Sequence, residues 1–440
     1  MLGSASLLMF PALLLALFIG FPVAFAMIAV AFVFGYWAFG PSIIFQFVQK
    51  IDAMASNFVL AAVPLFIFMG AMLERAGIAE RLFEAIHLWT RRLPGGLAIG
   101  TILMCVVFAA SSGVIGATET VVGLLTIPVM LKYKYDKALI SGVICAGGSL
   151  GTIIPPSIVV VLLGPVANVS IGDLLFGMLF PGLLMAFLYI VYIFFLCLVR
   201  PDKGPRISAS PDDPPFAEKV RISLVALWPP MLLIAAVLGS IFFGIAAPTE
   251  AAALGALGAL LLSVIYGDFS LPVLHEAVVK TLKVTVMILT ILMAGNMFAG
   301  VFIAGGGVQT TERLIAAANL GPWLTLGLFL LICFLAGFIL DWISILLIFI
   351  PVFMPIINKI GFDPVWFCVL FLIIIQTSYL SPPMAPAIFY LRGIAPPEIT
   401  IHHMFRGVVP FIVLQLLTLT ITAAFPQLVL WLPSVLLGFR

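Results

Sequence analysis

Four short stretches decide how this chain folds. They are AASSGVIGATET at 109–120, GTIIPPS at 151–157, AGFILDWIS at 336–344 and SYLSPPM at 378–384. Each interrupts a long apolar tract with small, hydroxyl-bearing, acidic or proline residues. Proline removes a backbone donor, and the residue before it is driven out of the helical region. We therefore expect interrupted helices at all four places.

The four stretches belong to one internal repeat. Its first copy runs over 93–157 and its second over 320–384, and three anchors align without gaps. The anchors lie 227 positions apart, and they are Leu93 with Leu320, Asp136 with Asp363, and Pro155-Pro156 with Pro382-Pro383.

The composition places the chain in a membrane. Hydrophobic residues make up 64% of its 440 residues and charged residues only 9%. Apolar tracts long enough to cross a bilayer follow one another, without the strict alternation of a β-barrel. We predict an all-α polytopic membrane protein in contact with lipid. The net charge of +2 gives no indication of a nucleic-acid partner.

The distribution of cations predicts the orientation. Sixteen of the 20 Lys and Arg residues fall in loops that can share one face of the membrane. The positive-inside rule puts that face in the cytoplasm, with both termini outside, and makes the two copies an inverted repeat. The sixteen cations lie in the loops 75–92, 132–137, 200–221, 280–283 and 392–406.

The predicted organisation is a first repeat over 1–199, a cytoplasmic linker over 200–221 and a second repeat over 222–440. Each repeat holds scaffold spans, one re-entrant hairpin and one broken span. The sequence also permits two full spans in place of the first hairpin, with the same topology. The remaining predicted segments are an interfacial arm helix at 78–93, hairpins at 94–131 and 321–358, broken spans at 136–168 and 363–391, and spans at 174–199 and 408–436.

Inverted repeats with broken helices are typical of secondary transporters. A helix broken inside the membrane frees backbone carbonyls, which suit Na⁺, and amides, which suit an anion. Glu119 and Asp341 are the only acids well inside apolar tracts. Each is a Na⁺ ligand, a proton site or a structural acid bonded to backbone amides. Arg392 could offer charge to an organic anion, although a positive-inside anchor is the commoner role.

These motifs resemble one known family over essentially the whole chain. PLFIFMG at Pro64, SSGVIGATETVVGLLTIPVM at Ser111, GTIIPPS, PTEAAALG at Pro248, IFIPVFMPIINKIGFDP at Ile348 and SPPM at Ser381 resemble the large membrane subunit of tripartite ATP-independent periplasmic (TRAP) transporters. GATET and LDWIS resemble the branch linked to 2-oxo acids and other organic anions.

The resemblance implies an elevator-type importer in the bacterial inner membrane, with an ion-transporter-like fold and no enzyme activity. It would take up an organic acid with Na⁺, and whether protons join Na⁺ stays open. A periplasmic substrate-binding protein would deliver the substrate, and a small four-helix membrane subunit would be a separate chain. The moving transport domain would comprise 94–170 and 321–392.

The resemblance also implies site residues. Two mirror-related neighbourhoods would bind Na⁺, and the substrate would sit between the hairpin tips. The Na⁺ residues would be Ser111, Ser112, Gly113, Gly151, Thr152 and Pro155 in the first repeat, and Gly337, Asp341, Thr377, Ser378, Ser381 and Pro382 in the second. The residues facing the substrate would be Ser112, Ser157, Ser344, Ser381 and Arg392.

Three alternatives remain at this point. A symporter of similar fold could work without a binding protein, driven by Na⁺ or H⁺. A membrane-embedded enzyme would need a nucleophile–base pair or a metal cluster, and the sequence displays neither. A channel would fit a continuous polar-lined path better.

Overall fold

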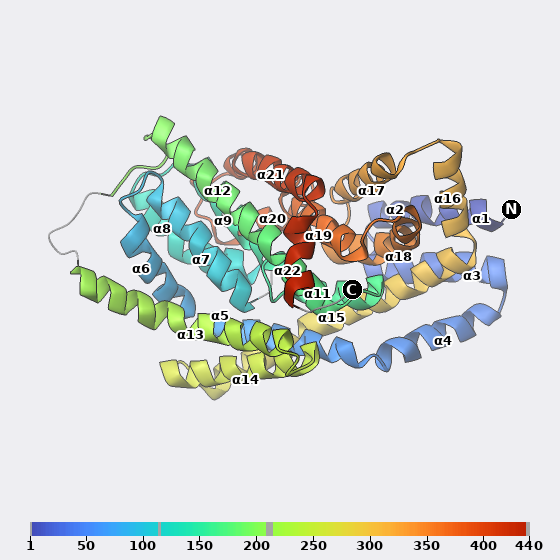
Figure 1. The fold of residues 1–440 in the computed structure, drawn as a ribbon, viewed down its shortest axis with the longest axis horizontal. Helices are drawn as coiled ribbons and strands as arrows, with labels where there is room; N and C mark the ends of the chain where they lie inside the picture. The colour runs from blue at the N-terminus through green and yellow to red at the C-terminus, as the bar shows by residue number, and fades with distance from the viewer. Residues whose placement is uncertain (1, 113–115, 208–213, 437–440) are drawn as a thin grey trace.

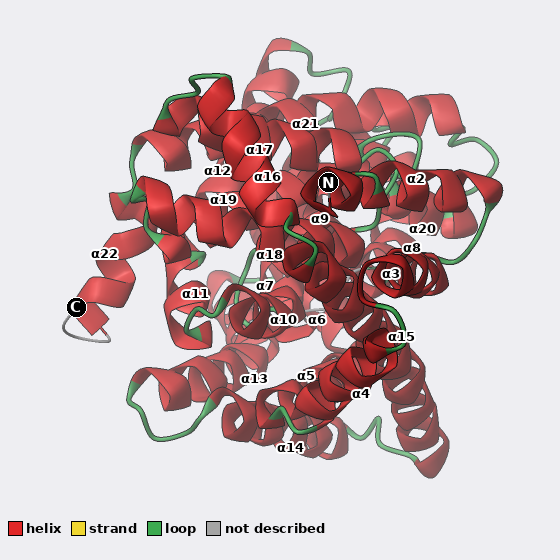
Figure 2. Ribbon diagram, turned by 90° about the vertical axis from the view of Figure 1, so that its right-hand side faces the viewer, coloured by secondary structure: helices red, strands yellow, loops and turns green. Residues whose placement is uncertain are grey.

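The computed structural model describes residues 2–112, 116–207 and 214–436, and within these ranges the protein is made of helices and loops (Figure 2). Seven helices are long and apolar enough to cross a membrane, and shorter apolar helices lie between them. The longer helices run roughly along the longest axis of the molecule (Figure 1). The prediction of an all-α polytopic membrane protein is confirmed.

The first half contains the predicted arm helix, hairpin and broken span. Gly20 follows one helix in the left-handed conformation and Val23 begins the next, so the first long apolar tract is divided at this point. The helices are α1 (Leu2–Leu7), α2 (Met9–Ile19), α3 (Val23–Phe39), α4 (Ser42–Ala55), η1 (Phe58–Ala61), α5 (Ala62–Arg75), α6 (Ile78–Thr90), α7 (Gly96–Ser112), α8 (Ala117–Lys132), α9 (Lys137–Ser149), η2 (Leu150–Thr152), α10 (Ile158–Ala167), α11 (Ile171–Gly177) and α12 (Leu179–Val199).

The second half repeats this order of elements. Pro248 opens α14 at its first turn, and Glu250 caps this helix by accepting the N–H of Ala247 at 2.8 Å. The helices are α13 (Phe216–Phe242), α14 (Pro248–Tyr266), α15 (Leu271–Ala304), α16 (Gly307–Ala317), α17 (Pro322–Ala336), α18 (Trp342–Ile360), α19 (Pro364–Leu380), α20 (Pro386–Ile394), α21 (Ile401–Ala424) and α22 (Gln427–Leu436).

Three boundaries differ from the sequence prediction. The helix α13 begins at Phe216, inside the predicted linker, because the residues after Pro215 continue the helical pattern of the following span. A loop is predicted at 280–283, whereas α15 is one continuous helix of 34 residues that includes these positions. The last predicted span, 408–436, is two helices, α21 and α22, that meet at Phe425-Pro426.

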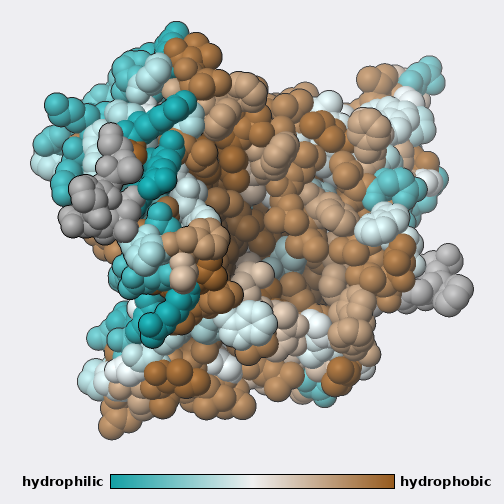
Figure 3. Space-filling view, turned by 60° about the vertical axis from the view of Figure 1, so that its left-hand side comes forward, coloured by the Kyte–Doolittle hydropathy of each residue, from teal (hydrophilic) through white to brown (hydrophobic). Residues whose placement is uncertain are grey.

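The predicted cytoplasmic loops meet at one end of the molecule. Asp136 donates its backbone N–H to the Lys203 carbonyl, and Gly95 does the same to Gly204. Lys137 forms an ion pair with Glu398 at 3.7 Å. Hydrophilic residues gather at this end, and a broad hydrophobic surface covers much of the rest of the visible face (Figure 3). The observed contacts therefore join loops that charge counting assigns to one side.

The helix α6 lies at the same end as an amphipathic element. Ile78, Leu82 and Ile86 on its apolar stripe are buried, whereas Glu80 and Glu84 are exposed. Its His87 stacks on Phe83 with 5.6 Å between ring centroids, and burial together with the nearby Arg91 lowers the pKa of His87. A ring packed in this way fits the predicted interfacial arm helix at 78–93.

Candidate functional site at the broken helices

The first hairpin consists of α7 and α8. Their bases lie together, because Leu97 near the start of α7 donates its N–H to the Tyr135 hydroxyl just beyond α8, at 3.2 Å. Ser111 and Ser112 are the last residues of α7, and Gly113 lies outside the described residues. The chain thus enters and leaves on one face, as a hairpin or a pair of spans requires.

The second hairpin consists of α17 and α18, and its bases also meet. Trp323 packs edge-on against Phe362, with 5.3 Å between ring centroids. Asp341 is the N-cap of α18 and accepts the N–H groups of Ile343 at 3.1 Å and Ser344 at 3.4 Å. It also accepts the Ser344 hydroxyl. Asp341 therefore satisfies the free amides at a helix start, and Ser344 is occupied in the same cap.

The first broken span runs through α9, η2 and α10. Asp136 caps α9 by accepting the Leu139 N–H at 2.9 Å. The helix opens after Thr152, and the Pro155-Pro156 bond is cis. Thr152 donates its hydroxyl to the Ser149 carbonyl at 2.9 Å, and Ser157 donates its hydroxyl to the Thr152 carbonyl at the same distance. The predicted interruption is present, and hydroxyl groups bind the carbonyls it frees.

The second broken span repeats this design in α19 and α20. Asp363 caps α19 by accepting the Trp366 N–H at 3.0 Å, and the Pro382-Pro383 bond is cis. Thr377 and Ser378 donate their hydroxyls to carbonyls one turn earlier, at 2.7 and 2.6 Å. The α19 helix ends at Leu380, directly before the predicted site residues Ser381 and Pro382.

The two broken spans run in opposite directions. Lys137, in the first turn of α9, pairs with Glu398, which lies just beyond the end of α20. The first broken span therefore begins at the face where the second one finishes. This is the arrangement that an inverted repeat predicts.

Close contacts bring each hairpin to its own break. A methyl group placed on Gly337 would lie 2.8 Å from the Ser378 Cβ, so the end of α17 rests on α19. Gly151 lies beside Ala109 near the end of α7, at an ordinary contact distance of 3.8 Å for an added Cβ. In each repeat, the first helix of the hairpin thus contacts the interrupted helix close to its break.

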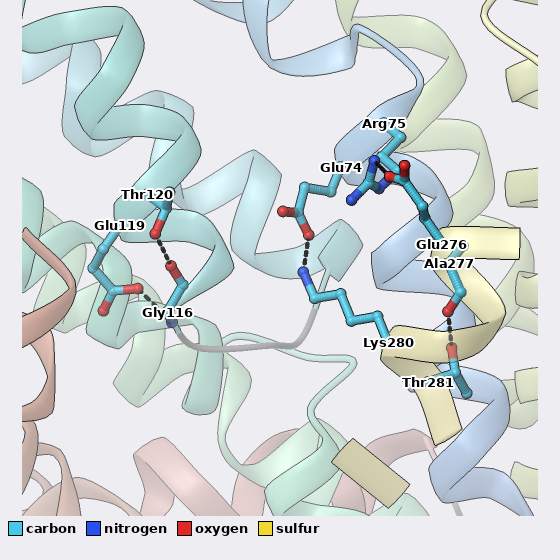
Figure 4. A network of polar contacts seen from close by, with 9 residues as sticks. All are labelled: Glu74, Arg75, Gly116, Glu119, Thr120, Glu276, Ala277, Lys280 and Thr281. Carbon is cyan, nitrogen blue, oxygen red and sulfur yellow. Dashed lines mark hydrogen bonds and ion pairs between the residues drawn. The ribbon is translucent and has the colours of Figure 1, made fainter. Parts of the chain in front are cut away.

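Glu119 sits at the base of the first tip as a fully buried acid. It accepts the Gly116 N–H at 2.6 Å from within the first turn of α8, and Thr120 donates its hydroxyl to the Gly116 carbonyl at 2.7 Å (Figure 4). Its carboxyl group occupies the space beside Gly148, where an added Cβ would lie 2.2 Å from the Glu119 Cδ. This geometry fits the structural reading of Glu119.

Arg392 lies apart from these contacts. It is exposed in the last turn of α20, and its guanidinium donates to the Ile399 carbonyl at 3.3 Å. Its contact braces the loop that follows α20. A role for Arg392 in substrate binding remains a prediction.

Sequence reasoning missed the residues that join one repeat to the other. Gln376 of α19 donates from its side-chain amide to the Thr152 hydroxyl of η2, and both residues are fully buried. Gly116 packs against the ring of Tyr390 from α20. A glutamine inside an apolar tract was the available signal, since buried polar groups in membranes are rare.

A second network braces helices of the two halves away from the breaks. Glu74 and Arg75 of α5 form ion pairs with Lys280 and Glu276 of α15 (Figure 4). These two pairs join the two halves through helices outside the predicted transport domain.

This combination of repeated hairpins and opposed broken spans defines a multi-pass membrane permease. The family model for the "Tripartite ATP-independent periplasmic transporter, DctM component" matches residues 10–428. The chain belongs to this family and is a TRAP transporter large permease subunit, a transport protein and not an enzyme.

Three relatives illustrate the match. The C4-dicarboxylate TRAP large permease of Pseudomonas aeruginosa is 30% identical over 90% of this chain and 91% of its own length. The sialic acid TRAP large permease of Vibrio cholerae is 30% identical, and the ectoine/5-hydroxyectoine permease of Ruegeria pomeroyi is 31% identical. Each of the latter two aligns over 96% of this chain and 97% of its own length.

A solved structure shares the fold. The Alcanivorax borkumensis YdaH transporter, described as having an unusual topology, aligns with a TM-score of 0.64. The alignment covers 91% of this chain and 90% of that one at 16% sequence identity. At this identity the likeness supports the polytopic fold alone.

Proposed function

We propose that this chain is the permease of a Na⁺-coupled importer of an organic carboxylate in the bacterial inner membrane. The observation that carries the proposal is the pairing of each hairpin with a broken span inside the apolar core. Gly337 rests on Ser378 in the second repeat, and Gly151 lies beside Ala109 in the first. Main-chain and hydroxyl oxygens gather there, and oxygens of this kind suit Na⁺.

The ion sites would use the residues named from the sequence. In the second repeat, the carboxylate of Asp341 is the only charged group among them and would supply the anionic ligand. Its oxygens bind the first turn of α18, so an ion at this point would also fix the start of that helix. In the first repeat, the ligands would be neutral oxygens around Gly151 and Thr152.

The substrate would lie between the two tips, where the N-terminus of α10 has no side-chain cap and offers its amides to a carboxylate. Ser157 directly precedes α10, and Ser344 lies in the first turn of α18. The relatives are named as permeases for C4-dicarboxylates, for sialic acid and for ectoine and 5-hydroxyectoine. The GATET and LDWIS tips favour a 2-oxo acid or another monocarboxylate for this chain.

The importer would need two partners. One is a periplasmic binding protein that delivers the substrate, and the other is a small four-helix membrane subunit. A relative named "Isethionate TRAP transporter permease protein DctMQ" is 31% identical, and this chain aligns with 58% of its length. The longer relative leaves room for an additional membrane segment that other systems carry as a separate chain.

We propose an elevator movement of the transport domain, with 94–170 and 321–392 as its core. The opposed direction of the two broken spans supports this, because exchange between mirror-related arrangements would present one site to each side in turn. The braces between α5 and α15 would stay with the stationary scaffold.

Uptake into liposomes tests the proposal. The permease would be reconstituted with its small membrane subunit and supplied with the binding protein of the same transporter. Radiolabelled pyruvate, lactate, succinate and N-acetylneuraminate would be tested one at a time. We expect accumulation driven by an inward Na⁺ gradient, and loss of that dependence in Asp341→Asn. Equal uptake with K⁺ in place of Na⁺ would reject Na⁺ coupling. Full uptake without the binding protein would favour the self-sufficient symporter.

A further inference from the structure

One polar contact crosses directly between the two broken spans. Gln376 precedes the predicted ion residue Thr377, and its side-chain amide donates to the hydroxyl of Thr152, a predicted ion residue of the other repeat. The exposed fraction of both side chains is 0%. A buried hydrogen bond between two uncharged side chains at this depth needs a physical reason, because apolar residues would fill the space without desolvation cost.

The contact fixes Thr152 from outside its own repeat. The Thr152 hydroxyl donates to the Ser149 carbonyl, and the Thr152 carbonyl accepts the Ser157 hydroxyl. Gln376 occupies an acceptor site of the same hydroxyl. A change in the position of Thr152 would therefore displace Gln376 and the last turn of α19 or break this hydrogen bond.

The side-chain carbonyl oxygen of Gln376 does not take part in this contact. Its Oε1 has no hydrogen-bond partner among the described residues, although it is buried. A buried carbonyl oxygen without a donor is unfavourable, so the side chain gains from any rearrangement that satisfies it. The Nε2 of Gln376 is bound to the first repeat, and Gln376 directly precedes Thr377, a predicted ion residue of the second repeat.

We propose that Gln376 couples the two ion sites, so that Na⁺ bound at one break raises the affinity at the other. The inference rests on the proposed function, because it requires Na⁺ at both breaks. An ion that orders η2 would hold Thr152, and Thr152 would hold Gln376 and the last turn of α19. The second ion would then meet a site that is already ordered, which is positive cooperativity.

The chain provides a matched control for this residue. Gln415 of α21 is also fully buried, donates to the Ser149 hydroxyl at 3.4 Å and also has an unpartnered Oε1. Gln415 contacts the first repeat at Ser149, whose carbonyl accepts the Thr152 hydroxyl, but it lies outside both predicted ion sites. Gln415→Leu removes a buried amide of the same type without removing the contact between the breaks.

Equilibrium binding of radioactive Na⁺ to the purified permease tests the coupling. We expect a Hill coefficient above 1 for the wild type and for Gln415→Leu. It should fall to about 1 in Gln376→Leu, because two uncoupled sites bind independently. Gln376→Asn shortens the side chain so that its amide no longer reaches Thr152, and it covers the case in which Gln376→Leu does not fold. Both variants leave every predicted ion residue in place.

The outcomes separate this inference from the proposed function. Absence of Na⁺ binding in the wild type would reject the ion coupling itself. Na⁺ binding with a Hill coefficient of 1 in the wild type would overturn only the role of Gln376. Unchanged cooperativity in Gln376→Leu, or in Gln376→Asn where only that variant folds, would do the same.

Discussion

The two broken spans match anchor by anchor in the sequence, yet they lie in different surroundings. Every residue of the first break, from Leu150 to Ser157, is buried, whereas Pro382, Pro383 and Met384 of the second break are exposed. The acids differ in the same direction, since Glu119 is fully buried and Asp341 only partly so. A sequence repeat therefore specifies the same backbone break twice without specifying the same environment. One copy is closed by its neighbours while the other is open.

The crossing of α21 over α9, the helix that leads into the first break, offers the most disruptive test. The helix α21 crosses α9 where Gly407 meets Gly142, and a methyl group on Gly407 would lie 2.1 Å from the Ala138 carbonyl oxygen. Backbone on both sides cannot move aside, so we expect Gly407→Ala to cost about 3 kcal/mol or more. Thermal unfolding and the yield of folded protein would measure this.

Gly327 is the control for that substitution, because an added Cβ on it meets nothing within 4 Å. Gly327→Ala in α17 should be neutral, or stabilising by up to about 1 kcal/mol. Equal effects of the two alanine substitutions would show that the α9–α21 crossing is not closely packed.

Equivalent cysteines compare the two breaks directly. Ser157 and Met384 lie 227 positions apart, and their exposed fractions are 0% and 38%. In a background without the five natural cysteines, Met384→Cys should react with a water-soluble maleimide more than about tenfold faster than Ser157→Cys. Similar rates would mean that both breaks are equally open in the membrane.

Local backbone signals in the sequence predicted much of this arrangement. The proline pairs at 155–156 and 382–383 lie at helix breaks as predicted, and the anchors Asp136 and Asp363 each cap the helix that follows. These residues act on their own backbone, so the sequence near them contains the information.

Contacts between distant residues could not be predicted in the same way. Gln376 and Thr152 are 224 positions apart, and Glu119 meets Gly148 only because α8 packs on α9. Apolar periodicity also did not predict where a helix is divided. The first repeat has two separate helices, α4 and α5, whereas the second has one continuous helix, α15, over the matching stretch. Asn57 marks the boundary after α4, because its side chain caps η1 by accepting the Val59 N–H at 3.1 Å.

The acids at the two tips should differ in their effect on Na⁺. Asparagine is as good an N-cap as aspartate, so Asp341→Asn should keep the start of α18 while lowering Na⁺ affinity more than about tenfold. Glu119→Gln should keep the bond to Gly116 and leave Na⁺ affinity near that of the wild type. Na⁺-dependent shifts in the unfolding temperature would report both.

An alanine at position 341 removes both the charge and the helix cap. Asp341→Ala should lose about 1 kcal/mol of stability in addition to the Na⁺ effect. Wild-type Na⁺ affinity in Asp341→Asn would remove this acid from the ion site and leave it a structural cap, like Glu119.

The smallest expected effect lies at the ends of the broken spans. Lys137 and Glu398 join the start of the first to the end of the second at 3.7 Å, with 38% and 67% of their side chains exposed. Solvent screens such a pair, so Glu398→Gln should cost only about 0.2–1 kcal/mol, and less at high salt. Lys359 and Glu312 form the comparison pair near the base of the second hairpin, at 2.6 Å with Glu312 only 28% exposed. Glu312→Gln should therefore cost more than Glu398→Gln at every salt concentration. The reverse order in thermal unfolding would mean that the contact between the two broken spans is buried in the assembled transporter.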